Sequence, residues 1–440
     1  MTMIEDCLFA HAEATPDKTA ICCGSRRLTY AELAEDVKLE ADRLSGCGDA
    51  CQVVLLPCTQ DERFVITYLA AHVAGKTCVP LEAGIPSATL DALRRQCLSA
   101  PLPPHTADVL FTTGTTGRRK GVMISHTALL ADAENLAEAH GFTSATVFVV
   151  CGPMSHIGSL SKLYPLLLQG GTLILLKSLS DMNAFFDAFT AKERCMATFL
   201  VPASIHMLLQ FGADRLSALA DRLDFIETGA APLGQADMKT LCRLLPHTRL
   251  YNTYASTETG IISTFDFNAG EPLPGCLGKP MKHARLRITD EGHVACAGPT
   301  LMSGYLGDTR LTQEVMHDGW LITSDLGTID EKGRLRLQGR EGDTINVGGY
   351  KVAPAEVEDA ALSFPALADC ICLPADSPLF GRCLRLLFSV KQGARVSKRD
   401  LARHIASKVE PYKVPRIFEQ VDAVRRTFNG KLDRKSYLQE

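Results

Sequence analysis

The chain has 440 residues, of which 46% are hydrophobic and 22% charged, a composition that allows a sizeable buried core and argues against disorder or a small disulfide-stapled scaffold. The 46 Lys and Arg against 50 Asp and Glu give a net charge of −4, so no overall attraction to nucleic acid is expected. Residues 1–10 hold no basic stretch and 147–176 is too interrupted for a membrane span, so we expect a soluble, cytoplasmic protein without integral membrane contact.

The first part of the chain alternates short apolar runs with helix-length segments, which is typical of a doubly wound α/β protein with a largely parallel sheet. Thr29 and Glu32 have the spacing of a capping box and predict a helix that begins near residue 30. The other expected elements are, in chain order, a strand at 51–56, a helix at 64–74, and strands at 78–81, 147–151, 172–176, 198–201 and 225–228.

After about Leu250 the pattern changes to short strands separated by turn signals. The expected strands are 285–288, 293–297, 327–330 and 334–338. They predict a β-rich subdomain, and the last hundred residues predict a small α+β unit that begins near Gly339.

The sixteen cysteines include no Cys-x-x-Cys pair. Without a signal sequence, reduced and mostly buried thiols explain them better than disulfides or a structural metal site. We therefore expect no metal bound by cysteine.

The most distinctive segment is 110–121, in which an apolar strand leads into a loop of threonines and glycines that ends in Lys120. Glycines let backbone N–H groups converge on an anion, hydroxyls add donors, and a lysine adds positive charge. A flexible Gly/Thr turn is the alternative interpretation of the same residues. A P-loop is disfavoured, because Gly114 and Gly117 are three residues apart and Gly121 follows the lysine.

This segment resembles the phosphate-binding loop of the AMP-forming adenylating superfamily, which includes acyl-CoA synthetases, peptide-synthetase adenylation domains and luciferases. Other segments resemble further motifs of that superfamily in the same order along nearly the whole chain. They are 28–33, 78–82, 153–158, 229–233, 251–258, 298–299 with 304–305, 323–325, 339–343 with 348–351, and 429–434. Each motif is weak by itself, whereas the ordered series is specific.

The resemblance implies an ATP-dependent ligase that joins a carboxylate to the α-phosphate of ATP, releases pyrophosphate and passes the acyl group to a thiol. It implies ATP, Mg²⁺ and CoA, or the phosphopantetheine of a carrier protein, as cofactors. It also implies domain alternation, in which a small mobile C-terminal domain takes one orientation for adenylation and another for thioester formation. The expected domains are 1–338, a hinge at 339–343 with Gly342 as its centre, and 344–440.

The resemblance also assigns roles residue by residue. Lys431 would bridge the carboxylate and the phosphate, Thr257 would donate to the α-phosphate, and Glu258 would hold Mg²⁺. Tyr254 would cover adenine, Asn252 would pair with the adenine edge, Asp325 would accept from the ribose hydroxyls and Arg340 would reach the ribose–phosphate end. The remaining nucleotide-binding residues would be Thr112, Thr113, Gly114, Thr115, Thr116, Gly117, Lys120, Gly229, Ala230 and Ala231, and the acyl pocket would contain His156, Ile157, Gly158 and Ala255.

Taken singly, these side chains have ordinary structural interpretations. Asp325 before a turn could be a cap, Tyr254 and His156 could be core residues, and Lys431 could belong to a solvated basic cluster. Only the ordered motif series favours the functional interpretation over these alternatives.

The chain departs from the superfamily pattern at several points. Ala255 and Ser324 stand where glycine is usual, Arg119 replaces a proline, and Gly342 replaces the usual Asp or Lys of the hinge. The N-terminal domain is abbreviated near 93–108, where a short proline-containing linker replaces the strand and helix of relatives.

The substrate class follows from the acyl pocket. Amino-acid-activating relatives place an aspartate where this chain has Ile157, so an aryl or aliphatic acid without a free α-amine is expected, with room beside Gly158. CoA is the expected acceptor, and a carrier protein or an o-succinylbenzoate-CoA ligase activity are alternatives. A catalytically silent nucleotide- or acyl-binding homologue is disfavoured by the intact set Lys120, Glu258, Asp325, Arg340 and Lys431.

Overall fold

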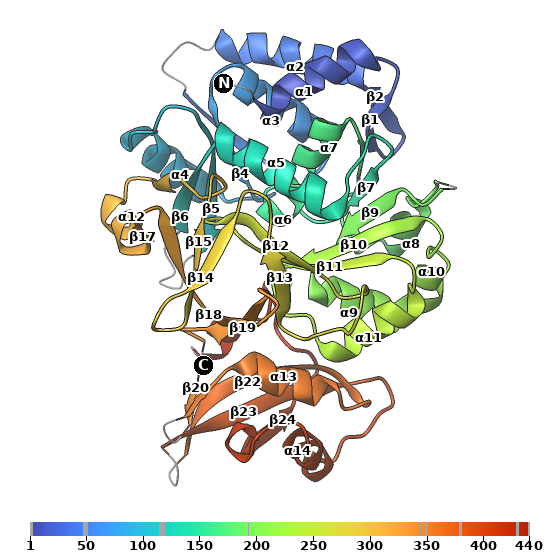
Figure 1. Ribbon diagram of the computed structural model, residues 1–440, viewed down its shortest axis with the longest axis vertical. Helices are drawn as coiled ribbons and strands as arrows, with labels where there is room; N and C mark the ends of the chain where they lie inside the picture. The colour runs from blue at the N-terminus through green and yellow to red at the C-terminus, as the bar shows by residue number, and fades with distance from the viewer. Residues whose placement is uncertain are drawn as a thin grey trace.

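The computed structural model describes residues 3–46, 52–113, 119–191, 193–343, 345–347, 350–377, 381–427 and 431–438. Figure 1 shows a large N-terminal region above a smaller C-terminal unit, which here means the described residues from 345 to 438. The large region contains two main sheets with helices on their faces, and the C-terminal unit has a sheet of its own. This architecture confirms the expected fold class.

The central strands of the larger sheet run parallel, as predicted, with β1 and β2 pairing antiparallel at one edge. The parallel strands are β1 (Thr19–Cys23), β7 (Val147–Val150), β8 (Thr172–Leu175), β9 (Met196–Phe199), β10 (Leu223–Gly229) and β11 (Arg249–Ser256), and the antiparallel edge strand is β2 (Arg26–Thr29). Strand β9 ends two residues earlier than the sequence pattern predicts. The reason is that Val201 is already the N-cap of the next helix, with Pro202 at its first position.

Beyond β11 the sheet continues with antiparallel strands and forms the expected β-rich part. These strands are β12 (Gly260–Asp266), β13 (Cys276–Pro280), β14 (Arg285–Ile288), β15 (His293–Ala297), β17 (Met316–His317), β18 (Trp320–Ile329) and β19 (Leu335–Arg340). Strand β18 is longer than predicted, so Asp325 lies inside it and is paired with Arg340 of β19.

The second sheet has the order β16-β6-β5-β4-β3. Its strands are β3 (Val53–Pro57), β4 (Thr77–Leu81), β5 (Thr106–Thr113), β6 (Arg119–Ser125) and β16 (Gly304–Tyr305). The linker before β5 is shorter than predicted, because residues up to Ser99 belong to a helix and Thr106 already belongs to the strand. Only residues 100–105 connect the two elements.

The helices of the N-terminal region cover both sheets (Figure 1). They are α1 (Ile4–Ala14), α2 (Tyr30–Ser45), α3 (Glu62–Val73), α4 (Ser87–Ser99), α5 (His126–His140), α6 (Ile157–Leu160), α7 (Leu163–Gln169), α8 (Met182–Asp187), α9 (Pro202–Phe211), α10 (Ala213–Ser217), α11 (Gln235–Leu244) and α12 (Thr309–Val315). The predicted capping box is confirmed at α2, where Thr29 and Glu32 bond to each other's backbone N–H. Within the described ranges, no helix combines the length and apolarity needed to cross a membrane.

A buried polar network attaches α1 to the second sheet. His72 of α3 contacts the Glu5 carboxylate at 2.7 Å through Nδ1 and the Asp108 carboxylate at 3.1 Å through Nε2. Tyr68 donates to the other oxygen of Asp108 at 2.8 Å. Burial by itself lowers the pKa of His72, but the two carboxylates outweigh burial and raise it to about 10. His72 is therefore an imidazolium held between two carboxylates.

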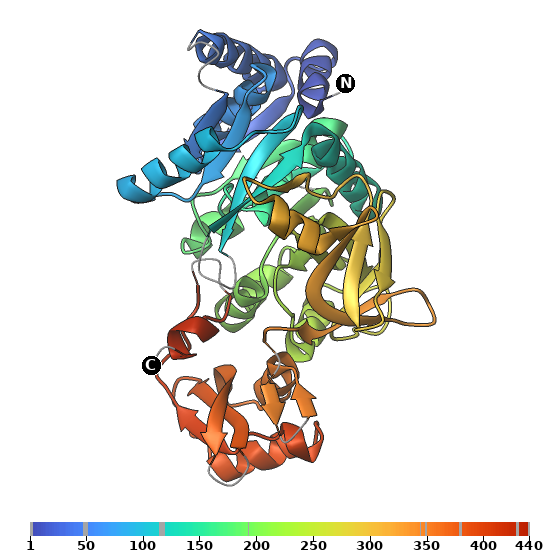
Figure 2. The same ribbon diagram turned by 90° about the vertical axis from the view of Figure 1, so that its left-hand side faces the viewer.

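The C-terminal unit contains β20 (Ile345–Val347), β21 (Tyr350–Val352), α13 (Pro354–Leu362), β22 (Leu367–Ser377), β23 (Gly381–Val390), α14 (Lys398–Ala406), the 3₁₀ turn Pro411–Lys413, β24 (Ile417–Gln420) and α15 (Arg434–Leu438). Strands β22 and β23 are antiparallel, and β24 joins β23 in parallel. The unit has its own core, which includes Val357, Phe388 and Ile405. Figure 2 shows the red C-terminal helix on the side of this unit that faces the N-terminal region. The cysteines within the described ranges are free and mostly buried.

Candidate active site

The predicted phosphate-binding segment is the connection between β5 and β6. Thr112 pairs with Lys120 and Thr113 with Arg119 across the two strands, whereas Gly114, Thr115, Thr116 and Gly117 lie outside the described residues. The Lys120 ammonium lies over the ring of Tyr305, 5.3 Å from its centroid. The sequence motif included Tyr305 but gave it no role.

Glu258 and Lys120 approach the same tyrosine. Glu258 lies in the turn between β11 and β12, next to Thr257, and its Oε1 accepts a hydrogen bond from the Tyr305 hydroxyl at 3.1 Å. Burial and the Glu258 charge both raise the pKa of Tyr305, so it remains a neutral donor. Tyr305 reaches this position because β16 pairs with β6, with Tyr305 opposite Val122.

Asp325 is a shared acceptor in the β-rich part of the site. Its Oδ2 accepts from the Tyr254 hydroxyl at 2.7 Å, and its Oδ1 accepts from Arg340 Nε at 2.9 Å. Burial, followed by the Asp325 charge, raises the pKa of Tyr254, which keeps that hydroxyl protonated. Three residues that the sequence assigns to the nucleotide therefore form one hydrogen-bonded group.

The two segments assigned to adenine lie side by side at the ends of parallel strands. Gly229 of β10 is opposite Thr253 of β11, and a Cβ at Gly229 would lie 2.8 Å from the Thr253 carbonyl oxygen. Ala230 follows with a φ of +68°, and Ala231 is partly buried. Asn252 is buried and donates to the Cys276 carbonyl at 3.1 Å, so its predicted pairing with adenine remains a prediction.

The predicted acyl pocket surrounds the start of α6. His156 is the N-cap residue of this helix, and Ile157 is its first residue. Burial lowers the pKa of His156, with a smaller contribution in the same direction from the Lys431 charge, so its ring is neutral near pH 7. Ala255 is partly buried in β11, opposite Ile261 of β12.

The ring of Phe199 occupies the space into which a side chain at Gly158 would point. A Cβ at Gly158 would lie 2.9 Å from Cε1 of Phe199, and one at Gly229 would lie 3.8 Å from Cε2 of the same ring. Phe199 therefore lies between the two glycines, and the room expected beside Gly158 is not open in that direction. The sequence offered no signal for this, because Phe199 ends a strand that is distant from both motifs.

A buried ion pair lies behind Phe199. Lys162 Nζ contacts Glu227 Oε1 at 2.7 Å, both side chains are 1% exposed, and the ammonium lies 5.1 Å from the centroid of the Phe199 ring. Neither charge was singled out from the sequence. Since the two charges compensate each other, this wall of the region adds no net charge.

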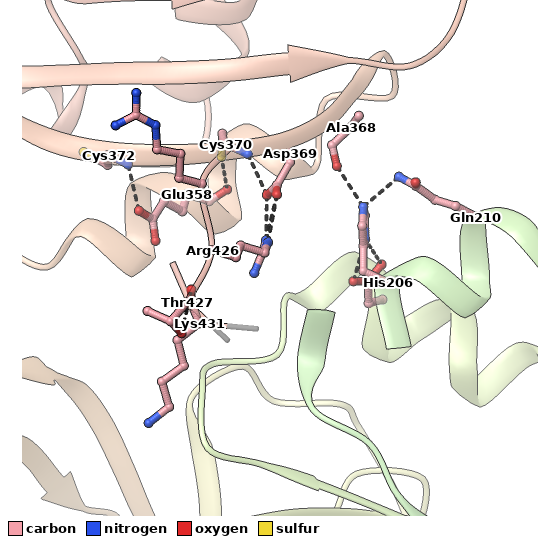
Figure 3. Close-up of polar contacts among 12 residues, drawn as sticks. His206, Gln210, Glu358, Ala368, Asp369, Cys370, Cys372, Arg426, Thr427 and Lys431 are labelled. Carbon is pink, nitrogen blue, oxygen red and sulfur yellow. Dashed lines mark hydrogen bonds and ion pairs between the residues drawn. The ribbon is translucent and has the colours of Figure 1, made fainter. Parts of the chain in front are cut away.

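Lys431 approaches the same site from the C-terminal unit. Desolvation, together with the positive charge of Arg340, lowers the pKa of Lys431, while the charges of Asp325 and Glu258 raise it. The Lys431 charge in turn lowers the pKa of His156, and Lys431 is exposed, so its predicted role at the phosphate remains a prediction. Figure 3 shows the Lys431 side chain extending away from the sheet of the C-terminal unit.

The residues beside the predicted hinge are ordered by two backbone bonds. Glu341 N donates to the Ser324 carbonyl at 2.8 Å, and Asp343 N donates to the Arg340 carbonyl at 2.9 Å. Gly342 is exposed, and a Cβ added there would have no atom within 4 Å. Its role as a hinge remains a prediction.

The donor set is suitable for a hard divalent cation. Glu258 is partly exposed and offers carboxylate oxygens, which Mg²⁺ prefers together with phosphate oxygens. Lys120 and Arg340 supply further positive charge from protein side chains.

Comparison with known proteins gives consistent matches over most of the chain. The model of the AMP-binding enzyme family matches residues 8–99 and 94–306, and that of the AMP-binding enzyme C-terminal domain matches 356–431. The chain is 26% identical to 2-succinylbenzoate–CoA ligase of Bacillus licheniformis, covering 97% of this chain and 98% of the relative. It is 27% identical to feruloyl-CoA synthase of Amycolatopsis sp., covering 96% of this chain and 95% of the relative. The fold is similar to ATP-bound MatB from Rhodopseudomonas palustris, with a TM-score of 0.88, 23% identity and coverage of 99% and 98%.

Proposed function

Since this chain belongs to the AMP-binding enzyme family, we propose that it activates a carboxylic acid with ATP to form an acyl-AMP and pyrophosphate, then transfers the acyl group to the thiol of CoA. Membership of the family confirms the resemblance seen in the motif series. The observations that support the proposal are the hydrogen-bonded group of Tyr254, Asp325 and Arg340, and the approach of Lys120 and Glu258 to the same tyrosine, Tyr305.

Acyl-AMP formation brings two anions together, the carboxylate of the acid and the α-phosphate of ATP. Lys431 binds both and offsets the charge that develops between them. Lys120 and Arg340 attract the phosphates, and Thr257 donates to the α-phosphate. Lys431 is an exposed residue of the C-terminal unit, so its ammonium would approach the phosphates from that unit.

The nucleoside is held by the residues around β11 and β18. Tyr254 and Asn252 lie beside adenine, and Asp325, fixed by Tyr254 and Arg340, accepts from the ribose hydroxyls. Mg²⁺ bound at Glu258 would screen the phosphate charges and orient the pyrophosphate leaving group.

We infer an aryl or aliphatic acid that has no free α-amine. The segment from His156 to Gly158 offers a neutral imidazole and an apolar side chain, and no carboxylate that could pair with an ammonium. Phe199 limits the depth of the pocket and presents an apolar ring to the acyl group.

Carboxylate-dependent ATP–pyrophosphate exchange tests this function. A suitable panel is benzoate, 2-succinylbenzoate, ferulate, butyrate and octanoate, with alanine as the amino-acid control. We expect exchange with at least one of the acids and none with alanine. Exchange with alanine alone would contradict the inferred acid class, and no exchange with any carboxylate would favour a catalytically silent homologue.

The thiol acceptor is tested separately, because a carrier-protein phosphopantetheine can use the same chemistry. Synthetic acyl-AMP of the best acid should be consumed with CoA at a higher rate than with the phosphopantetheine arm alone. The reverse order would favour a carrier protein as the acceptor. Preferred activation of 2-succinylbenzoate over the other acids would support the second candidate function, that of an o-succinylbenzoate-CoA ligase. The chain is similar over almost its full length to the 2-succinylbenzoate–CoA ligase of Bacillus licheniformis.

A further inference from the structure

Lys431 lies in a segment after β24 that we call the hairpin, namely residues 425–427 and 431–433, which pair antiparallel; residues 428–430 between them lie outside the described residues. Thr427 N donates to the Lys431 carbonyl at 2.7 Å, Asp433 N donates to the Arg425 carbonyl at 3.0 Å, and Arg426 and Leu432 form an antiparallel bridge. A lysine has a long flexible stem, so the backbone that carries it determines where its ammonium can reach. The attachment of this hairpin is therefore a determinant of the first half-reaction.

Two ion pairs attach the hairpin to the C-terminal unit, one on each side of Lys431. Before it, Arg426 Nη2 lies 2.8 Å from both oxygens of Asp369, and Arg426 Nε donates to Oδ2 at 3.1 Å. After it, Arg434 Nη2 lies 2.8 Å from both oxygens of Glu358. Bidentate pairs of this kind fix orientation as well as distance.

The two pairs differ in burial and in what they contact. Glu358 is buried inside the unit and also accepts from Cys372 N at 2.7 Å, so the Arg434 pair belongs to the core of the unit. Asp369 and Arg426 are 20% and 31% exposed, and Asp369 lies at the start of β22. The Asp369 pair is therefore the one near the surface that faces the N-terminal region.

The start of β22 touches the N-terminal region directly. The carbonyl of Ala368 accepts a hydrogen bond from His206 Nε2 of α9 at 2.8 Å, and His206 Nδ1 donates to Asp237 of α11 at 3.0 Å (Figure 3). The hydrogen bond to Asp237, and to a smaller extent the Ala368 carbonyl and the Asp369 charge, raise the pKa of His206. A second contact, from Gln235 N to Asp359 Oδ1 at 2.9 Å, joins the same two parts of the molecule.

We propose that Asp369 and Arg426 are positioning residues for Lys431. Asp369 is covalently next to the interface residue Ala368, and its carboxylate holds Arg426, which lies five residues before Lys431. In this orientation β22 is held against α9, and the Asp369–Arg426 pair holds the hairpin against β22. The position of the hairpin then determines where the Lys431 ammonium lies. The inference rests on the proposed role of Lys431 in acyl-AMP formation.

An ordinary surface ion pair is the alternative, and it makes different predictions. Exposed pairs contribute little to stability and do not distinguish between two half-reactions. A positioning pair changes the half-reaction that uses Lys431 and leaves the other unchanged. It also has no effect once the lysine is absent.

The test uses the full chain and the panel acid that gives the highest exchange rate. Acyl-AMP formation is measured by pyrophosphate exchange, and thioester formation by consumption of synthetic acyl-AMP with CoA. Asp369→Asn and Arg426→Gln should each slow acyl-AMP formation by roughly 10- to 100-fold, the scale of a misplacement of about 1 Å. Thioester formation should change by less than about twofold. In the Lys431→Ala background, Asp369→Asn should cause no further loss.

Glu419→Gln is the control, because the Arg385–Glu419 pair joins β23 to β24 in the same unit and neither residue belongs to the hairpin or to the contact with α9; its side chains are 35% and 48% exposed. Both half-reactions should keep the wild-type rates in this variant. Equal losses in the two half-reactions of Asp369→Asn, or an undiminished loss in the Lys431→Ala background, would overturn the proposal. If Asp369→Asn and Arg426→Gln leave the rate of acyl-AMP formation unchanged while Lys431→Ala lowers it, the positioning proposal is overturned and the catalytic assignment of Lys431 stands. An unchanged rate in Lys431→Ala would remove both the catalytic assignment and this inference.

Discussion

Asp325 shows how one side chain can serve both the fold and the proposed site. Its carboxylate holds Tyr254 and Arg340 in place, and its remaining lone pairs are those expected to accept from the ribose. Removing it therefore affects the nucleotide through direct contacts and through its two partners, whereas the acyl pocket around His156 is built from other elements.

Asp325→Ala should raise the KM for ATP in pyrophosphate exchange by roughly 10- to 100-fold, the scale of hydrogen bonds to a charged group. The KM for the acid should change much less. Asp325→Asn, which can still accept from Tyr254, should lie between wild type and the alanine variant, and exposed Asp290→Ala is the control. An unchanged KM for ATP in Asp325→Ala would remove the assignment.

Phe199 lies against Gly158, a residue of the predicted acyl pocket. Phe199→Ala removes the ring between Gly158 and Gly229, so kcat/KM for the bulkier acids of the panel should rise relative to butyrate by about 10-fold or more. Phe211→Ala is the control, because Phe211 is 74% exposed on α9. The same ratio of rates in wild type and Phe199→Ala would show that the ring does not face the acid.

Helix α1 depends on a charged group that the sequence did not reveal. Because the folded-state pKa of His72 is raised from 6.5 to about 10, its stabilisation is fully present below about pH 6.5 and is lost as the pH rises toward 10. The free energy of unfolding, measured by urea titration, should fall from pH 7 to pH 10. The fall should be smaller in His72→Gln, and parallel pH profiles of the two proteins would contradict the charged state of His72.

The connection between β19 and β20 is the element on which domain alternation would depend. Proline fixes φ near −65° and removes a backbone donor, so Gly342→Pro should slow acyl-AMP formation and thioester formation unequally. Gly342→Ala is a close control, since its Cβ has open space and the glycine does not occupy the left-handed region. Equal slowing of the two steps by proline would place the hinge elsewhere.

Elements with strong local signals were predictable from the sequence, and long-range contacts were not. The capping box of α2, the parallel strands and the β-rich part after residue 250 follow from local patterns of side chains and turns. Phe199 against Gly158, Tyr305 between Lys120 and Glu258, and Lys162 with Glu227 join residues more than forty positions apart. Such contacts depend on how the sheets pack, which one-dimensional periodicity does not encode.

At the scale of the whole molecule, the proposed chemistry depends on two bodies meeting. The N-terminal region supplies Lys120, Glu258, Asp325 and Arg340, and the C-terminal unit supplies Lys431. Hydrogen bonds from His206 to Ala368 and from Gln235 to Asp359 join the two parts in the orientation of this structure. A single lysine on one body should therefore matter for one half-reaction only.

The rates of both half-reactions of Lys431→Ala test whether this lysine serves acyl-AMP formation and not thioester formation. Pyrophosphate exchange should fall by roughly 10²- to 10³-fold, the usual loss for one preorganised donor at a developing charge. Consumption of synthetic acyl-AMP with CoA should stay close to the wild-type rate, because that step does not need the ammonium at the α-phosphate. Comparable losses in both half-reactions would mean that Lys431 acts through folding or docking of the C-terminal unit, and an unchanged exchange rate would mean that it takes no part in adenylation.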